Sequence, residues 1–159
     1  MWKKVLQSIE EYYLVEIENL QKRIDENATG AAKSPGSMQS WSDKSKQEFT
    51  QLAEALSRDI PLLQMSYKQI TDILNHGKVL GNIISIGSII KLRYPNETND
   101  EYLVIVPASG GNLITVDGKD FFLLSEKSDL GKNLLNKKLN DKIKLKSGIE
   151  VLISEIINS

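Results

Sequence analysis

The spacing of apolar residues changes near His76 and Gly77, and this change limits the folds open to the chain. Before it, apolar residues recur every three or four positions, the spacing of one side of an α-helix. After it, short runs bounded by glycines alternate with a period of two, which is typical of β-strands. We therefore predict an α+β protein: a helical part at 1–76, a linker at 77–82 and a sheet domain at 83–159.

The helical part contains two apolar seams of threes and fours. Such a narrow seam suits two helices that pack along their length. Between the seams the chain is rich in Ala, Gly, Ser and Pro, so we expect an antiparallel helical hairpin with its tip at about 27–43. Pro61 lies inside the second seam and should kink that helix near Ser57. The seams are Leu6, Ile9, Tyr13, Ile17, Leu20 and Ile24, and Phe49, Leu52, Leu56, Ile60, Leu63, Tyr67, Ile70 and Leu74.

The second part shows strand candidates, a hairpin signal and one short helix. Asp117-Gly118 is a residue pair that favours a type I′ turn. Ser128 can cap a helix N-terminus, and Asp129 favours the positive end of the helix dipole. We expect a small domain around a curved antiparallel sheet, able to fold without the helices. The strand candidates are 88–92, 102–106, 112–116, 121–124, 143–145 and 150–156.

Composition removes several classes of function. The chain has no cysteine and one histidine, so neither a thiolate zinc site nor a site of several histidines can form. His76 instead stands where a helix should end, and a capping role is expected there. A net charge of −1 argues against a general nucleic-acid binder. No signal peptide or membrane helix is recognisable, so we expect a cytoplasmic protein with no membrane partner.

Residues 125–141 say most about function. They read SEKSDLGKNLLNKKLND and resemble the pattern ISxxSPLGxALLGKxxGDxV of the Gre family of bacterial transcription elongation factors (GreA and GreB). The chain departs from the pattern where Asp129 replaces Pro, and where Asn136 and Asn140 replace Gly, which indicates a divergent member. The matching residues are Leu124, Ser125, Ser128, Leu130, Gly131, Leu134, Leu135, Lys137 and Asp141.

The resemblance implies an FKBP-like fold for 83–159 and an accessory role on RNA polymerase. Such a factor binds beside the secondary channel and modulates transcription elongation. In the family, acidic residues at the hairpin tip hold a second magnesium ion at the polymerase active site, where backtracked RNA is hydrolysed. We expect no resident cofactor, no catalysis by the chain alone, and magnesium only in trans with the polymerase.

The tip of this chain departs from that chemistry. Asp43 is the only acid in the tip, and Lys44 and Lys46 flank it. Asp43 is the one candidate for a catalytic residue or metal ligand. The N-cap of the second helix is the simpler role for it, and Ser42 is the other candidate for that cap. The sequence leaves open whether the protein stimulates RNA cleavage or only occupies the secondary channel.

Two other groups of residues are candidate partner contacts. Met38 and Trp41 are apolar residues in the tip, and Lys132, Lys137 and Lys138 lie near the short helix. We expect a monomer that contacts RNA polymerase and meets nucleic acid only indirectly. The stretch that contains these lysines has two other interpretations: it is a solvated face, or it contacts a nucleic-acid backbone directly.

Two further functions stay open. One is a protein-interaction module in which the helices form a dimerising coiled coil. The other is an FKBP-like peptidyl-prolyl isomerase, because the resemblance implies that topology, although fold does not confer activity. An aromatic pocket would have to come from Tyr94, Tyr102, Phe121 and Phe122, and adjacent Phe residues on a strand face opposite sides.

Overall fold

The computed structural model describes residues 1–32, 39–77 and 81–159, and within them leaves the side chains of 27–46, 49, 52 and 55 undescribed. Two compact units are present, 1–11 with 68–159, and 12–67. The elements are α1 (Trp2–Ala32), α2 (Gln39–His76), β1 (Ile89–Arg93), β2 (Glu101–Val106), β3 (Leu113–Val116), β4 (Lys119–Ser125), α3 (Asp129–Leu134), β5 (Lys142–Lys144) and β6 (Glu150–Ile157). This is an α+β fold.

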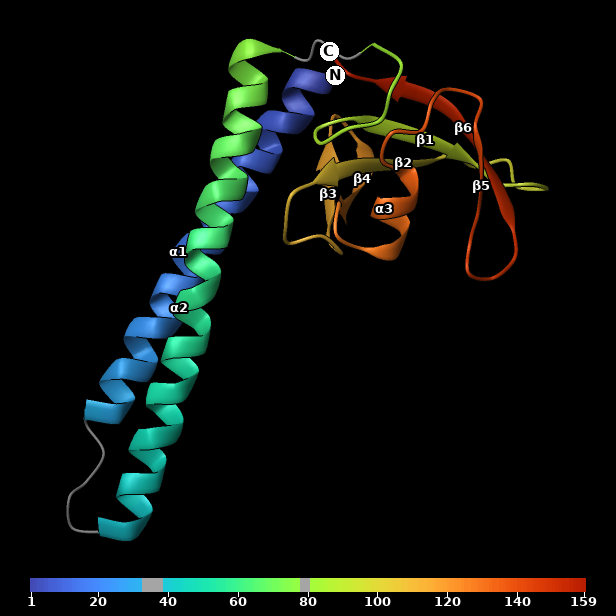
Figure 1. Cartoon of the computed structure of the whole chain (residues 1–159). Helices are drawn as coiled ribbons and strands as arrows, with labels where there is room; N and C mark the ends of the chain where they lie inside the picture. Colours follow the sequence, from blue (N-terminus) through green and yellow to red (C-terminus); the bar gives the residue numbers. More distant parts are fainter. Residues whose placement is uncertain (33–38, 78–80) are drawn as a thin grey trace. The chain divides into compact units, whose positions relative to one another are not determined.

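The two long helices run side by side (Figure 1), and every described side chain of the two predicted seams is buried or half-buried. The Thr71 hydroxyl donates a hydrogen bond of 2.6 Å to Glu10 Oε1, which fixes the antiparallel register of the pair. α2 remains one helix through Pro61. The stretch between the helices is shorter than the predicted 27–43, because α1 continues to Ala32 and α2 begins at Gln39. No helix among the described residues is long and apolar enough to span a membrane.

The end of α2 has the capping residues expected from the sequence. His76 Nδ1 lies 3.0 Å from the Asp72 carbonyl oxygen, where the tautomer protonated at Nδ1 donates a hydrogen bond. Gly77 follows with a φ of 69°, and its N–H donates to the Ile73 oxygen at 2.9 Å. A left-handed residue after the last turn is the usual way to satisfy the final helix carbonyls. The predicted helix end at His76 is confirmed.

The sheet has six strands in the order β3-β4-β2-β1-β6-β5, and it is mixed, not antiparallel as predicted. β2 pairs with β4 in parallel, because the chain leaves β2, lays β3 on the outer side of β4 and returns through a tight turn. That turn is Asp117-Gly118, with φ values of 51° and 77°, as a type I′ turn requires. Period-two alternation predicts the faces of a strand and not the direction of its non-local partner.

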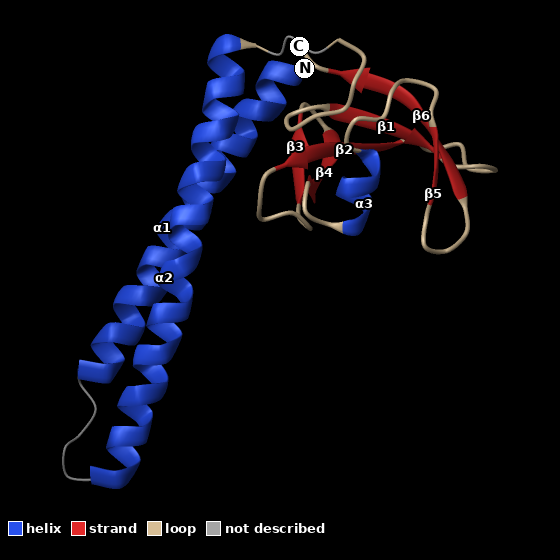
Figure 2. Ribbon diagram, viewed as in Figure 1, coloured by secondary structure: helices blue, strands red, loops and turns tan. Residues whose placement is uncertain are grey.

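The sheet is buried on both faces. On one face, residues of five strands form a core with Ile84 and with Leu134 of α3, which lies against that face (Figure 2). The opposite face carries Ile89, Val104, Val106, Phe121 and Leu123, all fully buried.

The first turns of α1 belong to the same compact unit as the sheet and contact it at two loops. Trp2 is 7% exposed and Val5 is fully buried, and the Trp2 indole N–H donates a hydrogen bond of 2.9 Å to the Gly87 oxygen. Lys4 forms an ion pair of 2.9 Å with Asp117 in the β3–β4 turn. The sheet unit therefore includes the start of α1. A fragment of 83–159 would lose these contacts, which the prediction that it folds without the helices did not include.

Candidate partner-binding surfaces

The short helix α3 begins directly against the end of β4. Ser128 is its N-cap, and the Ser128 Oγ accepts a hydrogen bond of 3.0 Å from the Gly131 N–H, as predicted. The same hydroxyl donates to the Ser125 carbonyl oxygen at 2.7 Å. A Cβ atom on Gly131 would lie 2.0 Å from that Ser125 oxygen, so only glycine fits there. Three residues of the quoted pattern, Ser125, Ser128 and Gly131, therefore form one local structure.

The two asparagines that replace glycines keep the backbone that glycine would adopt. Asn136 has a φ of 67° and Asn140 a φ of 69°. Asparagine is among the few non-glycine residues that enter the left-handed region readily. Asp141 closes the same turn, where its Oδ2 accepts a hydrogen bond of 2.7 Å from the Lys138 N–H. The departures from the pattern therefore preserve the turn after α3.

The third departure, Asp129, makes a contact that proline could not. Its carboxylate forms an ion pair of 2.5 Å with Lys146 in the β5–β6 turn. The hydrogen bond from Lys146, and next its charge, lower the pKa of Asp129. Both side chains are largely exposed, so the pair adds little stability. It ties the start of α3 to the β5–β6 turn.

The three lysines predicted to contact a partner lie on α3 and on the turn after it. Lys132 and Lys138 are exposed and Lys137 is half-buried. Residues 126–146 contain seven lysines against three acids. The Lys137 oxygen accepts a hydrogen bond of 2.9 Å from the Ile84 N–H, which fixes the turn to the sheet unit. We call Lys132, Lys137 and Lys138 the α3 lysine surface.

The predicted tip residues fall at the limit of the described structure. Met38 lies outside the described residues, as do the side chains of Trp41 and Asp43. The predicted N-cap at Asp43 or Ser42 is wrong, because α2 already begins at Gln39 and both residues stand inside its first turns. Ser and Asp favour caps over helix interiors, so the sequence alone predicts a loop up to residue 43.

The described carboxylates near this end of the hairpin do not form a cluster that could bind a metal ion. Asp25 and Glu26 on α1 and Glu48 on α2 are exposed, and Asp25 accepts a hydrogen bond of 3.1 Å from Gln21. Within the described part of the chain, no three acids or histidines lie close enough to hold a metal ion.

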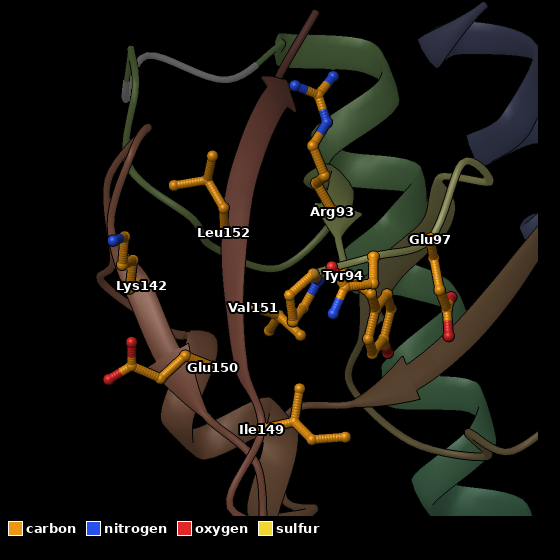
Figure 3. Close-up of a pocket in the computed structure, with 10 residues that line it drawn as sticks. Arg93, Tyr94, Glu97, Lys142, Ile149, Glu150, Val151 and Leu152 are labelled. Carbon is orange, nitrogen blue, oxygen red and sulfur yellow. The ribbon is translucent and has the colours of Figure 1, made fainter.

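A groove that the sequence did not indicate lies where β1 ends and β6 begins (Figure 3). Its volume is about 700 Å³, and Tyr94 and Ile149 are among its lining residues. Tyr94 donates a hydrogen bond of 2.5 Å to Glu101, and burial and then this bond raise the pKa of Tyr94. Only the non-local pairing of β1 with β6 brings these residues together, so no short-range signal could have revealed the groove.

The aromatic residues considered for an isomerase pocket divide between the faces of the sheet. Tyr102 packs on Phe121 with ring centroids 5.5 Å apart, while Phe122 and Tyr94 pack against the α3-side core. Three of the four still border one groove of about 530 Å³. Its remaining lining is largely acidic, unlike the apolar pocket that the isomerase alternative requires: Glu97, Asn99, Asp100, Glu101, Leu113 and Asp120.

Solved structures of Gre-type factors are similar to the chain along much of its length. Gfh1, a GreA factor homolog of Thermus thermophilus, is 19% identical with a TM-score of 0.37, over 93% of this chain and 94% of that one. Gfh1 of Thermus aquaticus is 20% identical with a TM-score of 0.37, over 92% of each chain. The factor GreA/GreB from Nitrosomonas europaea is 17% identical with a TM-score of 0.36, over 69% of this chain and 91% of that one.

No family model matches the sequence, and a search of curated proteins finds no match either. The solved structures that are similar to the chain are Gre-type factors.

Proposed function

We propose that the protein is an accessory factor of bacterial RNA polymerase that modulates transcription elongation. It binds beside the secondary channel as a monomer, with the sheet unit docking on the enzyme and the helical hairpin reaching inward. The protein performs no catalysis by itself.

One observation carries this proposal. The residues of 125–141 that resemble the Gre pattern form a single connected structure, from the Ser128 cap to the Asp141 turn. The departures at Asn136 and Asn140 keep the backbone of the glycines that they replace. A chain that joins this structure to a long antiparallel helical hairpin has both parts of a Gre-type factor.

The α3 lysine surface is the proposed docking site. Lysines beside an acidic partner surface speed association and fix orientation more than they add affinity. The turn after α3 holds these side chains on a fixed backbone, because Ile84 pairs with Lys137 and Asn136 on both its N–H and its carbonyl. Met38 and Trp41 remain proposed contacts at the far end of the hairpin.

The proposed factor stimulates cleavage of backtracked RNA weakly or not at all. Magnesium needs several oxygen ligands, and a second ion at the polymerase active site would have to take them partly from the tip. Asp43 is the only acid between residues 27 and 47, and Lys44 and Lys46 oppose the charge of a metal there.

A backtracked elongation complex tests this expectation. With the protein added, RNA cleavage should stay within about 2-fold of the complex alone, since one carboxylate beside two lysines is a weak ligand set. The Asp43→Ala variant should give the same rate. Strong cleavage that Asp43→Ala abolishes would show instead that Asp43 is a metal ligand in trans.

A further inference from the structure

One groove on the sheet unit combines aromatic rings with carboxylates. It is the groove of about 530 Å³ described above, and its lining residues include four acids and no lysine or arginine. Three of the other lining residues are aromatic: Tyr94, Tyr102 and Phe122. A concave site that offers both ring faces and carboxylates is complementary to an organic cation. We call this site the acidic groove.

The sheet separates most of the acids of this groove from the nearest cations. Asp100 is the exception, because Lys91 Nζ lies 2.8 Å from its carboxylate. Lys91 pairs with Tyr102 across β1 and β2, while Glu101 pairs with Leu92 of the α3-side core. Neighbouring residues on a strand face opposite sides of a sheet, so Glu101 points away from Lys91. Three cations gather on the other side, close to Asp100 or to the Tyr102 ring: Lys91, Arg93 and Lys119.

Two carboxylates on the α3 side lie at neighbouring positions of two strands. β2 and β4 are parallel, with Leu103 beside Phe122. The same register continued by two residues places Glu101 beside Asp120. Both residues are exposed, and neither forms an ion pair within the described part of the chain. Like charges at adjacent strand positions repel each other, so a cation placed between them is attracted by both.

Aromatic and apolar side chains form the rest of this side of the groove. Tyr94 and Phe122 are half-buried against the α3-side core, and Leu113 on β3 is 63% exposed. The Tyr94 hydroxyl donates a hydrogen bond of 2.5 Å to Glu101, which holds this carboxylate beside the ring. Burial and then this bond raise the pKa of Tyr94, and the charges of Glu101 and Glu97 add to the increase. The groove therefore has a negative potential and neutral ring walls.

Arginine fits this arrangement better than lysine does. A planar guanidinium stacks on aromatic rings and donates hydrogen bonds to two carboxylates as a fork. The ammonium group of lysine is a compact and strongly hydrated charge, which gains less from a ring face. β3, which contributes Leu113, is an edge strand of the sheet, so a partner segment can reach the groove from that edge.

We infer that the acidic groove binds an arginine side chain that a partner protein presents. Glu101 and Asp120 accept hydrogen bonds from the guanidinium, and Tyr94 and Phe122 lie against it. This surface has the opposite charge to the α3 lysine surface. The inference goes beyond the proposed function, because the groove can be tested without RNA polymerase.

A peptide titration of the full chain, followed by two-dimensional proton–nitrogen NMR, tests the chemistry of the groove. The probe is an alanine–arginine–alanine tripeptide with both ends blocked. It should bind with a Kd of about 1 mM and shift the amide signals of the lining residues. The same peptide with citrulline, which has the shape of arginine without its charge, should bind at least about 10-fold more weakly. Equal binding of the citrulline peptide, or of a lysine peptide, would overturn the assignment.

Two double variants test the location of the site. Glu101→Gln/Asp120→Asn removes both charges and keeps oxygens that accept the same hydrogen bonds, so it should unfold in urea like the wild type. It should bind the arginine peptide at least about 10-fold more weakly. Glu11→Gln/Glu18→Gln is the matched control, with the same charge change at exposed positions of α1, and its affinity should equal that of the wild type. Unchanged affinity of the first variant, or an equal loss in both, would refute the inference.

Discussion

Replacing Trp2 with alanine should destabilise the sheet unit by about 3 kcal/mol, although Trp2 lies in the first turn of a helix at the chain's start. Trp2 is 7% exposed, and its indole N–H donates to the Gly87 oxygen at 2.9 Å. The variant removes a large buried apolar side chain from the sheet unit and leaves the Gly87 oxygen without this donor. Urea unfolding followed by far-UV circular dichroism measures the effect, and a transition equal to the wild type would contradict it.

Two variants separate packing from other effects at this place. Trp2→Phe keeps most of the apolar contact and loses the hydrogen bond, so it should cost about 1 kcal/mol. Lys4→Ala removes an ion pair whose side chains are both 63% exposed, and it should leave the transition close to the wild type. A fragment of 81–159 lacks the contacts of Trp2 and Lys4 altogether, and we expect it to lose cooperative unfolding.

Replacing Gly131 with alanine should be at least as damaging, at about 3 kcal/mol or more. The new Cβ would lie 2.0 Å from the Ser125 carbonyl oxygen, which is backbone and has no other rotamer to adopt. α3 would have to move away from β4, and the Ser128 cap would move with it. A lower midpoint of guanidinium unfolding, together with weaker polymerase binding, is the expected result.

The matched control is Gly81→Ala, another change from glycine to alanine in the same unit. A Cβ at Gly81 meets nothing within 4 Å, so this variant should be neutral or slightly more stable. If Gly131→Ala unfolds at the same denaturant concentration as Gly81→Ala, the close fit of α3 against β4 does not matter for stability.

Local signals in the sequence predicted local structure well. The seams, the helix end at His76, the Asp117-Gly118 turn and the Ser128 cap each depend on residues within a few positions of one another. The glycines of the quoted pattern also indicated where the backbone is left-handed, because Asn136 and Asn140, which replace them, both have a positive φ.

The errors arose where distant parts of the chain meet. The parallel pairing of β2 with β4 depends on where β3 is placed, and no turn residue encodes that choice. The contact of Trp2 with Gly87 joins residues 85 positions apart, so no local pattern indicates that α1 completes the sheet unit. The N-cap prediction at Asp43 or Ser42 is wrong for a local reason: both residue types favour caps, yet α2 begins at Gln39.

Binding to core RNA polymerase tests the central claim most directly. The measurement compares the wild type with Lys132→Glu/Lys138→Glu and with Lys3→Glu/Lys119→Glu, two double variants with the same change of charge at exposed positions. We predict that the wild type binds, that the first variant binds about 10-fold more weakly or worse, and that the second binds nearly as well as the wild type. No binding by the wild type would contradict the account, and an equal loss in both variants would contradict the role of the α3 lysine surface.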